Sequence, residues 1–112
     1  MAQVGRREFA LAVDSLNRAL ERSPELVVAY EARASARFGL GQYREAAQDY
    51  QTALASSPGR ASPLWGLAEC YRLLADPRAA EAYQRYAERT DPDVTERQRE
   101  VARKWARELQ DR

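Results

Sequence analysis

The residues that could do chemistry are few in this 112-residue sequence. It has no histidine to act as a general base, and its single cysteine, Cys70, has apolar neighbours. A lone thiol in such surroundings is expected to be a small buried hydrophobe and not a nucleophile. Glu45 and Asp49 have the i, i+4 spacing of an ordinary solvated helix face. With no Gly-rich phosphate loop either, the sequence predicts no enzyme, no metal site and no cofactor.

The charge balance also limits the choice of partners. Lys and Arg together number 18 against 17 Asp and Glu, a formal net charge of +1, so the chain has no electrostatic footprint for nucleic acid. No apolar run approaches the roughly 20 residues that span a bilayer. Arg6 and Arg7 are followed by an amphipathic pattern and not by the apolar block of a signal peptide. The default prediction is a cytoplasmic protein, which an upstream leader would change.

Proline and alanine residues recur at a fixed spacing of 34. The recurring sets are Pro24, Pro58 and Pro92; Ala12, Ala46 and Ala80; and Ala19, Ala53 and Ala87. Only five prolines occur in the chain, so two equal gaps among three of them carry weight. A period of this length indicates a solenoid, in which each unit buries its apolar face against its neighbours.

The period and the residues on it resemble the tetratricopeptide repeat (TPR) family, whose unit is a 34-residue helix–turn–helix. The resemblance is best in residues 25–58, where the matching residues are Tyr30, Gly41, Tyr43, Ala46, Tyr50, Ala53, Leu54 and Pro58. In residues 59–92 they are Leu67, Ala68, Tyr71, Ala80, Ala87 and Pro92.

Four residues depart from the family pattern. Pro77 and Gln84 stand where the second helix of a unit has aromatic residues, and Arg33 and Arg37 stand where apolar residues are commoner. The unit that contains the arginines is therefore expected to be packed more loosely than its period suggests.

The resemblance implies an all-α, right-handed superhelical TPR domain over residues 1–112. Its expected parts are the second helix of an incomplete repeat (1–24), two full repeats (25–58 and 59–92) and a C-terminal capping helix (93–112). Apolar spacing, glycines and prolines place the helices at about 7–22, 25–38, 42–55, 62–74, 76–90 and 94–109.

Three helix starts are predicted from capping residues. Ser62 is expected to cap a helix whose first residue is Pro63, and Asp76 precedes Pro77 in the same way. Asp93 and Glu96 have the spacing of a capping box. Gly66, inside a helix, is expected to permit close approach of backbone or ligand.

In the TPR family the first helix of each unit lines a concave groove that receives peptides. Carried onto this sequence, the tentative groove residues are Glu31, Ser35, Phe38, Trp65, Glu69, Arg72, Arg99 and Arg103. The expected function is a protein–protein interaction module or scaffold that presents this groove to a segment of another protein. A clamp for the acidic tails of chaperones is not expected, because Glu31 and Glu69 would repel a carboxylate.

Two questions stay open at this level. Trp65 is either an exposed anchor for a bound segment or, after a small helix rotation, a core residue that leaves Leu64 exposed. The function also has an alternative, because the apolar stripe of residues 7–22 would drive homodimerisation or mark an excerpt of a longer TPR array. The tentative residues of that stripe are Phe9, Val13, Leu16 and Leu20.

Overall fold

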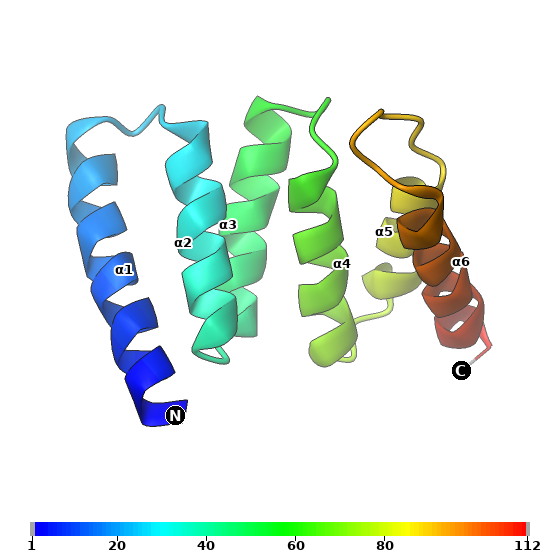
Figure 1. The fold of residues 1–112 in the computed structure, drawn as a ribbon, viewed down its shortest axis with the longest axis horizontal. Coiled ribbons are helices and arrows are strands. Elements are labelled where there is room, and N and C mark those ends of the chain that lie inside the picture. Colours follow the sequence, from blue (N-terminus) through cyan, green and yellow to red (C-terminus); the bar gives the residue numbers. More distant parts are fainter. Residues whose placement is uncertain (1, 112) are drawn as a thin grey trace.

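The structure, a computed structural model, describes residues 2–111, with side chains over residues 5–111. The described chain folds into six helices and contains no strand. The helices are α1 (Ala2–Arg22), α2 (Val27–Gly39), α3 (Tyr43–Ser56), α4 (Ser62–Leu73), α5 (Arg78–Ala87) and α6 (Glu96–Gln110). Successive helices run antiparallel (Figure 1). The all-α helical-repeat prediction is therefore confirmed.

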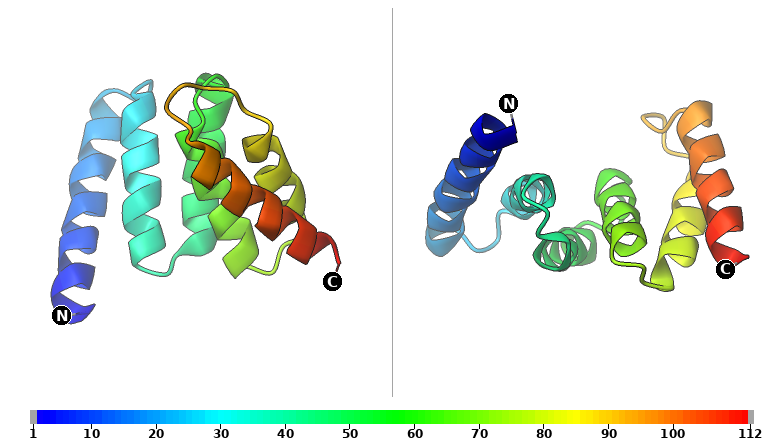
Figure 2. Two further views of the ribbon diagram at one scale, coloured as in Figure 1. Left: turned by 45° about the vertical axis from the view of Figure 1, so that its right-hand side comes forward. Right: turned by 90° about the horizontal axis from the view of Figure 1, so that it is seen from below.

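The helices stack as a solenoid. Each helix packs against the next in sequence, and α2 additionally contacts α4. Seen from below in Figure 2, α2, α4 and α6 lie on one side of the stack, and α3 and α5 lie on the other. The described chain measures 40 × 30 × 22 Å along its principal axes. The right-handed superhelical twist stays a prediction.

Small residues on the 34-residue period lie where the helices approach one another. Five alanines have no exposed surface: Ala34, Ala46, Ala53, Ala68 and Ala102. An alanine at such a position lets two helix backbones approach closely, so the larger side chains beside it interdigitate at native density. The period seen in the sequence is thus the period of the helix–helix contacts.

The second helix of residues 59–92 does not lack aromatic packing, although Gln84 occupies the usual aromatic position. Gln84 is exposed, while its neighbours Tyr83 and Tyr86 are 0% and 4% exposed. Tyr83 is among the largest fully buried side chains of the described chain. The aromatic rings are therefore displaced by one position on one side and two on the other.

The turns after α2 and α4 use the left-handed conformation that commonly ends helices. Gly41 has φ 78°, and Ala75, one period later, has φ 54°. Glycine adopts this region freely, whereas the Cβ of alanine makes it unfavourable. The second turn therefore keeps the geometry of the first without its favoured residue.

The N-caps of α4, α5 and α6 all differ from the three predicted ones. The capping box of α6 is formed by Thr95 and Gln98, in place of Asp93 and Glu96: Gln98 N donates to Thr95 Oγ1 at 3.1 Å, and Thr95 N donates to Gln98 Oε1 at 2.7 Å. Threonine at the cap also suits the preference of capping boxes for Ser or Thr.

Helix α4 begins at Ser62, the residue that was expected to be its cap. Its N-cap is Ala61, which makes no side-chain cap bond, so Ser62 is already helical and Pro63 is the second helical residue. Helix α5 begins at Arg78 with Pro77 as its N-cap, so Pro77 is not its first helical residue as expected. Asp76 still binds the start of the helix, because its Oδ1 accepts a hydrogen bond from Arg78 N at 2.9 Å.

Two helices, α1 and α5, differ from prediction in length. Helix α1 begins at Ala2 and not near residue 7, and α5 ends at Ala87 and not near residue 90. The remaining bounds lie within two residues of those expected.

Candidate binding groove

The predicted groove residues of α2 lie on one face, beside α4. Val28, Glu31 and Ser35 line a hollow of about 260 Å³ with Ala32 and Arg60, here called the α2 pocket. Because these positions step by three and four residues, they project from the same side of the helix. Val28 is 69% exposed, so this end of the face offers apolar surface to a partner.

A second hollow continues the same face. Phe38, Tyr50, Trp65, Gly66 and Glu69 line a space of about 290 Å³, here called the aromatic pocket. Its walls come from α2, α3 and α4. Three of the predicted groove residues therefore meet in one cavity, although they lie up to 31 residues apart in sequence.

Trp65 combines the two roles that the sequence left open. It is half-buried and packs on α5, with its ring centroid 5.5 Å from that of Tyr83 and 5.0 Å from that of Tyr86. Leu64 is 2% exposed, so the rotation that would expose it does not occur. Trp65 thus supports the core with one part of its surface and lines the aromatic pocket with another.

The floor of the aromatic pocket depends on a glycine. A Cβ at Gly66 would overlap the ring of Tyr50, which therefore lies directly on the α4 backbone. The close approach expected at Gly66 is made by this ring. Burial raises the pKa of Tyr50 to about 12, with further increases from Cys70, Glu31 and Glu69.

Glu69 and Arg72 form a fixed polar wall beside the aromatic pocket. Arg72 Nη2 lies 2.8 Å from Glu69 Oε2, and Arg72 Nε donates to Tyr83 Oη at 3.0 Å. The guanidinium also stacks 4.4 Å from the ring centroid of Trp105. Arg72 is thereby tied to α4, α5 and α6 at once.

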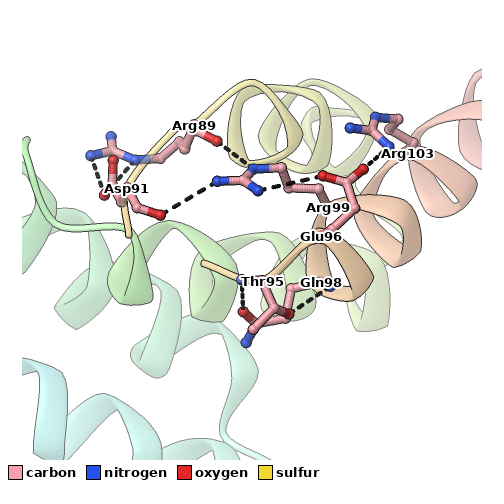
Figure 3. A network of polar contacts seen from close by, with 7 residues as sticks. All are labelled: Arg89, Asp91, Thr95, Glu96, Gln98, Arg99 and Arg103. Carbon is pink, nitrogen blue, oxygen red and sulfur yellow. Dashed lines mark hydrogen bonds and ion pairs between the residues drawn. The ribbon is translucent and has the colours of Figure 1, made fainter. Parts of the chain in front are cut away.

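Arg99 and Arg103 line neither pocket. Arg99 Nε donates to Arg89 O at 2.6 Å, which fastens the end of α5 to α6 (Figure 3). Arg99 and Arg103 lie 3.5 and 3.1 Å from the two oxygens of Glu96. Arg89 in turn donates to the carbonyls of Pro58 and Gly59. Arg99 accordingly stabilises the loop between α5 and α6.

Sequence reasoning missed two residues of this face. Arg60, in the loop before α4, pairs with Glu31: Nη1 lies 2.7 Å from Oε1, while Glu31 Oε2 accepts from Ser62 Oγ at 2.6 Å. Tyr50 was expected only as a packing residue, yet it lines the aromatic pocket. The signal for Tyr50 was Gly66, which leaves room for a ring above the helix.

A further hollow has a different set of lining residues. It measures about 560 Å³ between α3, the end of α4 and the start of α5. Its polar groups bind one another: Gln51 Nε2 donates to Tyr71 Oη at 2.6 Å, and Arg78 pairs with Asp76 at 2.8 Å while stacking on Tyr71. The polar side chains that line this hollow therefore already have partners within the chain.

The apolar stripe of α1 is only partly covered. Leu20 is 7% exposed, Val13 and Leu16 are half-buried, and Phe9 is 38% exposed. A Cβ at Gly39 would overlap the Phe9 ring, so this ring rests on the end of α2. Leu11, which the stripe did not include, is 61% exposed.

The described residues offer neither a membrane-spanning helix nor a metal-ligand cluster. Within residues 2–111 no helix is both long and apolar enough to cross a bilayer. The side chains described also contain no group of three or more His, Cys, Asp or Glu that could hold a metal ion. Cys70 is a buried free thiol, and burial raises its pKa to about 12.

Comparison with known proteins agrees with the geometry. A family model described as "Tetratricopeptide repeat" matches residues 37–98, which is more than half of the chain. No curated protein matches the sequence. The match spans the end of α2, all of α3, α4 and α5, and the start of α6. The chain therefore belongs to the tetratricopeptide repeat family, a non-catalytic family whose repeats generally mediate protein–protein interaction.

Proposed function

We propose that the chain is an interaction module that holds a segment of a partner protein in a groove along α2 and α4. The observation that carries this proposal is that residues of one face of α2, from Val28 to Phe38, line first the α2 pocket and then the aromatic pocket. Preformed pockets spare the partner part of the ordering cost of binding, because the receiving side is already rigid.

The anchoring residues suit this role. Half-buried aromatic residues held by packing are the usual energetic centre of an interface. Phe38 packs edge-on against Tyr43 at 5.1 Å, and Trp65 packs against α5, so both rings are held in place before a partner arrives. Ser35 lies between the two pockets and is exposed, which leaves a path for a backbone from one to the other.

The experiment is site-specific photo-crosslinking. A photoreactive amino acid replaces Ser35 in the groove, and in a control protein it replaces Glu81, which is exposed on α5. Mass spectrometry then maps the crosslinked partner residues. We expect one short partner segment to be labelled from position 35 and not from position 81. Equal labelling from both positions would contradict a groove along α2 and α4.

A second candidate function is self-association through α1, as a homodimer. We propose it because two apolar side chains of α1 are exposed, Phe9 at 38% on the stripe and Leu11 at 61% on another side of the helix. The expected residues, Phe9, Val13, Leu16 and Leu20, would then be covered more completely by a second copy. The two candidates use different faces, so one protein can have both.

A further inference from the structure

The aromatic pocket combines three aromatic rings with a carboxylate. Phe38, Tyr50 and Trp65 supply the rings, and Glu69 supplies the negative charge. The face of an aromatic ring carries negative potential and attracts a cation, most strongly when the cation is removed from water. The chemistry of the walls therefore favours a cationic guest.

The chain itself contains three examples of such an arrangement. Arg72 stacks 4.4 Å from the Trp105 ring and pairs with Glu69. Arg78 stacks 4.4 Å from the Tyr71 ring and pairs with Asp76. Arg33 lies 5.6 Å from the Tyr30 ring and pairs with Asp49. In each case the guanidinium pairs with a carboxylate and also lies over an aromatic ring.

The aromatic pocket has the same two components, but no arginine of the described chain lies over its rings. Within residues 5–111, the arginine–aromatic stacks involve Tyr30, Trp105 and Tyr71, and none involves Phe38, Tyr50 or Trp65. Arg72 Nη2 donates to Oε2 of Glu69, and Oε1 is the second acceptor of that carboxylate. A partner's guanidinium would thus find aromatic surface and an acceptor.

The negative field extends into the pocket. Burial is the largest cause of the raised pKa of Tyr50, and the carboxylates of Glu31 and Glu69 raise it further. Each of these carboxylates pairs with an arginine of the chain, Glu31 with Arg60 at 2.7 Å and Glu69 with Arg72 at 2.8 Å. Of the two, Glu69 lines the aromatic pocket and is the carboxylate that a guest there would reach.

We propose that the aromatic pocket takes an arginine side chain of the partner segment. The proposal rests on the groove function above and specifies the chemistry of its ligand. Arginine fits better than lysine, because a guanidinium is weakly hydrated and stacks flat on aromatic rings, whereas an ammonium is strongly hydrated. The partner segment is thus expected to place one arginine opposite Glu69 and to lie across Ser35 towards the α2 pocket.

The test uses four series of fluorescein-labelled 12-residue peptides, with arginine, citrulline, lysine or leucine at one central position and small neutral residues elsewhere. Citrulline keeps the shape of arginine and removes its charge. Binding to the whole chain is measured by fluorescence anisotropy. We expect the arginine series to bind roughly tenfold tighter than each of the other three.

Two variants locate the effect. Glu69→Gln keeps a hydrogen-bond acceptor for Arg72 and removes the pocket's charge, so the preference for arginine over citrulline should fall several-fold. Glu81→Gln removes a charge from exposed α5 and should leave the preference unchanged. Far-UV circular dichroism confirms that both variants keep the helical fold.

Several outcomes would overturn the proposal. Equal binding of the lysine series would remove the choice of arginine, and equal binding of the citrulline or leucine series would remove the charge. Absence of binding in all four series would also count against it. So would a dimer in sedimentation that Glu69→Gln abolishes, because a second copy of the chain would then occupy the pocket. The crosslinking from position 35 decides the groove function separately, so the two proposals can fail independently.

Discussion

Arg33 of α2 binds both carboxylate oxygens of Asp49 of α3. Its Nε donates to Oδ2 at 2.9 Å and its Nη2 donates to Oδ1 at 2.8 Å. Arg37 adds a third bond to Oδ2 at 2.9 Å, and Arg33 Nη1 donates to Asn17 Oδ1 at 2.8 Å. The Asp49 side chain is 5% exposed. One carboxylate therefore joins α2 to α3, and Arg33 extends the network to α1.

Replacing Asp49 with alanine should lower the free energy of unfolding by about 2–4 kcal/mol. The change leaves two arginines without their acceptor, and breaking a buried pair from one side is strongly destabilising. The arginine side chains are 17% and 20% exposed, which lets water compensate part of the loss. Urea unfolding measures the difference.

The matched control is Asp14→Ala. Asp14 pairs with Arg18 at 3.1 Å, but these side chains are 60% and 75% exposed. An exposed i, i+4 pair contributes at most about 0.5 kcal/mol. If both variants lost the same amount of stability, the Arg33–Asp49 network would have no special role.

The sequence predicted the helices better than the polar contacts between them. Apolar spacing within a helix, and the glycines and prolines that end it, involve residues near one another in sequence. Most helix bounds were therefore correct to within two residues. Asp49 looked like a surface residue because its i, i+4 relation to Glu45 is local. Its burial depends on Arg33 and Arg37, 16 and 12 residues away, which a one-helix pattern does not contain. The expectation that this unit packs loosely stays a prediction, although its two arginines bind Asp49.

Replacing Ala75 with glycine should raise the free energy of unfolding by roughly 0.5–1 kcal/mol. Ala75 has φ 54°, a left-handed conformation that alanine adopts only at a cost and glycine adopts freely. The gain is smaller than the relieved strain, because glycine also makes the unfolded chain more flexible.

The reciprocal change is Gly41→Ala, at φ 78° one period earlier. It should destabilise the fold by about 1 kcal/mol in the same urea experiment. A lower stability for Ala75→Gly would show that the turn after α4 does not strain its alanine.

Replacing Gly66 with alanine should destabilise the chain by about 1–3 kcal/mol, the usual range for overpacking a core. The added methyl group would overlap the ring of Tyr50, which must then leave the α4 backbone. Because Tyr50 lines the aromatic pocket, binding of the arginine peptides should weaken as well. Gly59→Ala is the control, since a Cβ at Gly59 meets no atom within 4 Å. Equal stability for Gly66→Ala and the parent chain would mean that Tyr50 has another place to pack.

The groove could be predicted only in part, for reasons of geometry. The 34-residue period placed Glu31, Ser35, Phe38, Trp65 and Glu69 on one side of their helices, and they line two adjoining pockets. The period also placed Arg99 on that side, but its length lets it reach the carbonyl of Arg89. The position of a long side chain's charged group depends on hydrogen-bond acceptors in the loops. The loop sequences do not follow the 34-residue period, so the period does not predict these contacts.

Stability should fall above about pH 9. Burial raises the pKa of Cys70 from 9.0 to about 12, and those of Tyr50 and Tyr83 from 10.0 to about 12. Between these values the unfolded chain loses protons that the folded chain keeps, so rising pH favours unfolding. Below pH 9 both states are protonated at these groups, and their contribution is fully present. Each group adds a slope of at most about 1.4 kcal/mol per pH unit.

Urea unfolding from pH 8 to 11.5 measures this dependence. Cys70→Ala should remove the part of the decline that begins near pH 9 and leave the tyrosine part, which begins near pH 10. A thiol reagent should also react with native Cys70 far more slowly than with urea-unfolded protein. A stability that rises between pH 9 and 11 would contradict the burial of these groups.

Replacing Leu11 with glutamate should shift the chain towards the monomer if it self-associates through α1. Leu11 is 61% exposed, and a two-fold contact through its side of α1 would bury it in both copies. Leu11 is a cleaner position than Phe9, because the Phe9 ring also packs on Gly39 and its loss would loosen α1 from α2. Leu73→Glu is the matched control, since Leu73 is 42% exposed on α4 and lies outside the α1 surface. Sedimentation equilibrium at high micromolar concentration should show a dimer for the parent chain and for Leu73→Glu, and a monomer for Leu11→Glu. A parent chain that sediments as a monomer at that concentration would show that this apolar surface does not bring two copies together.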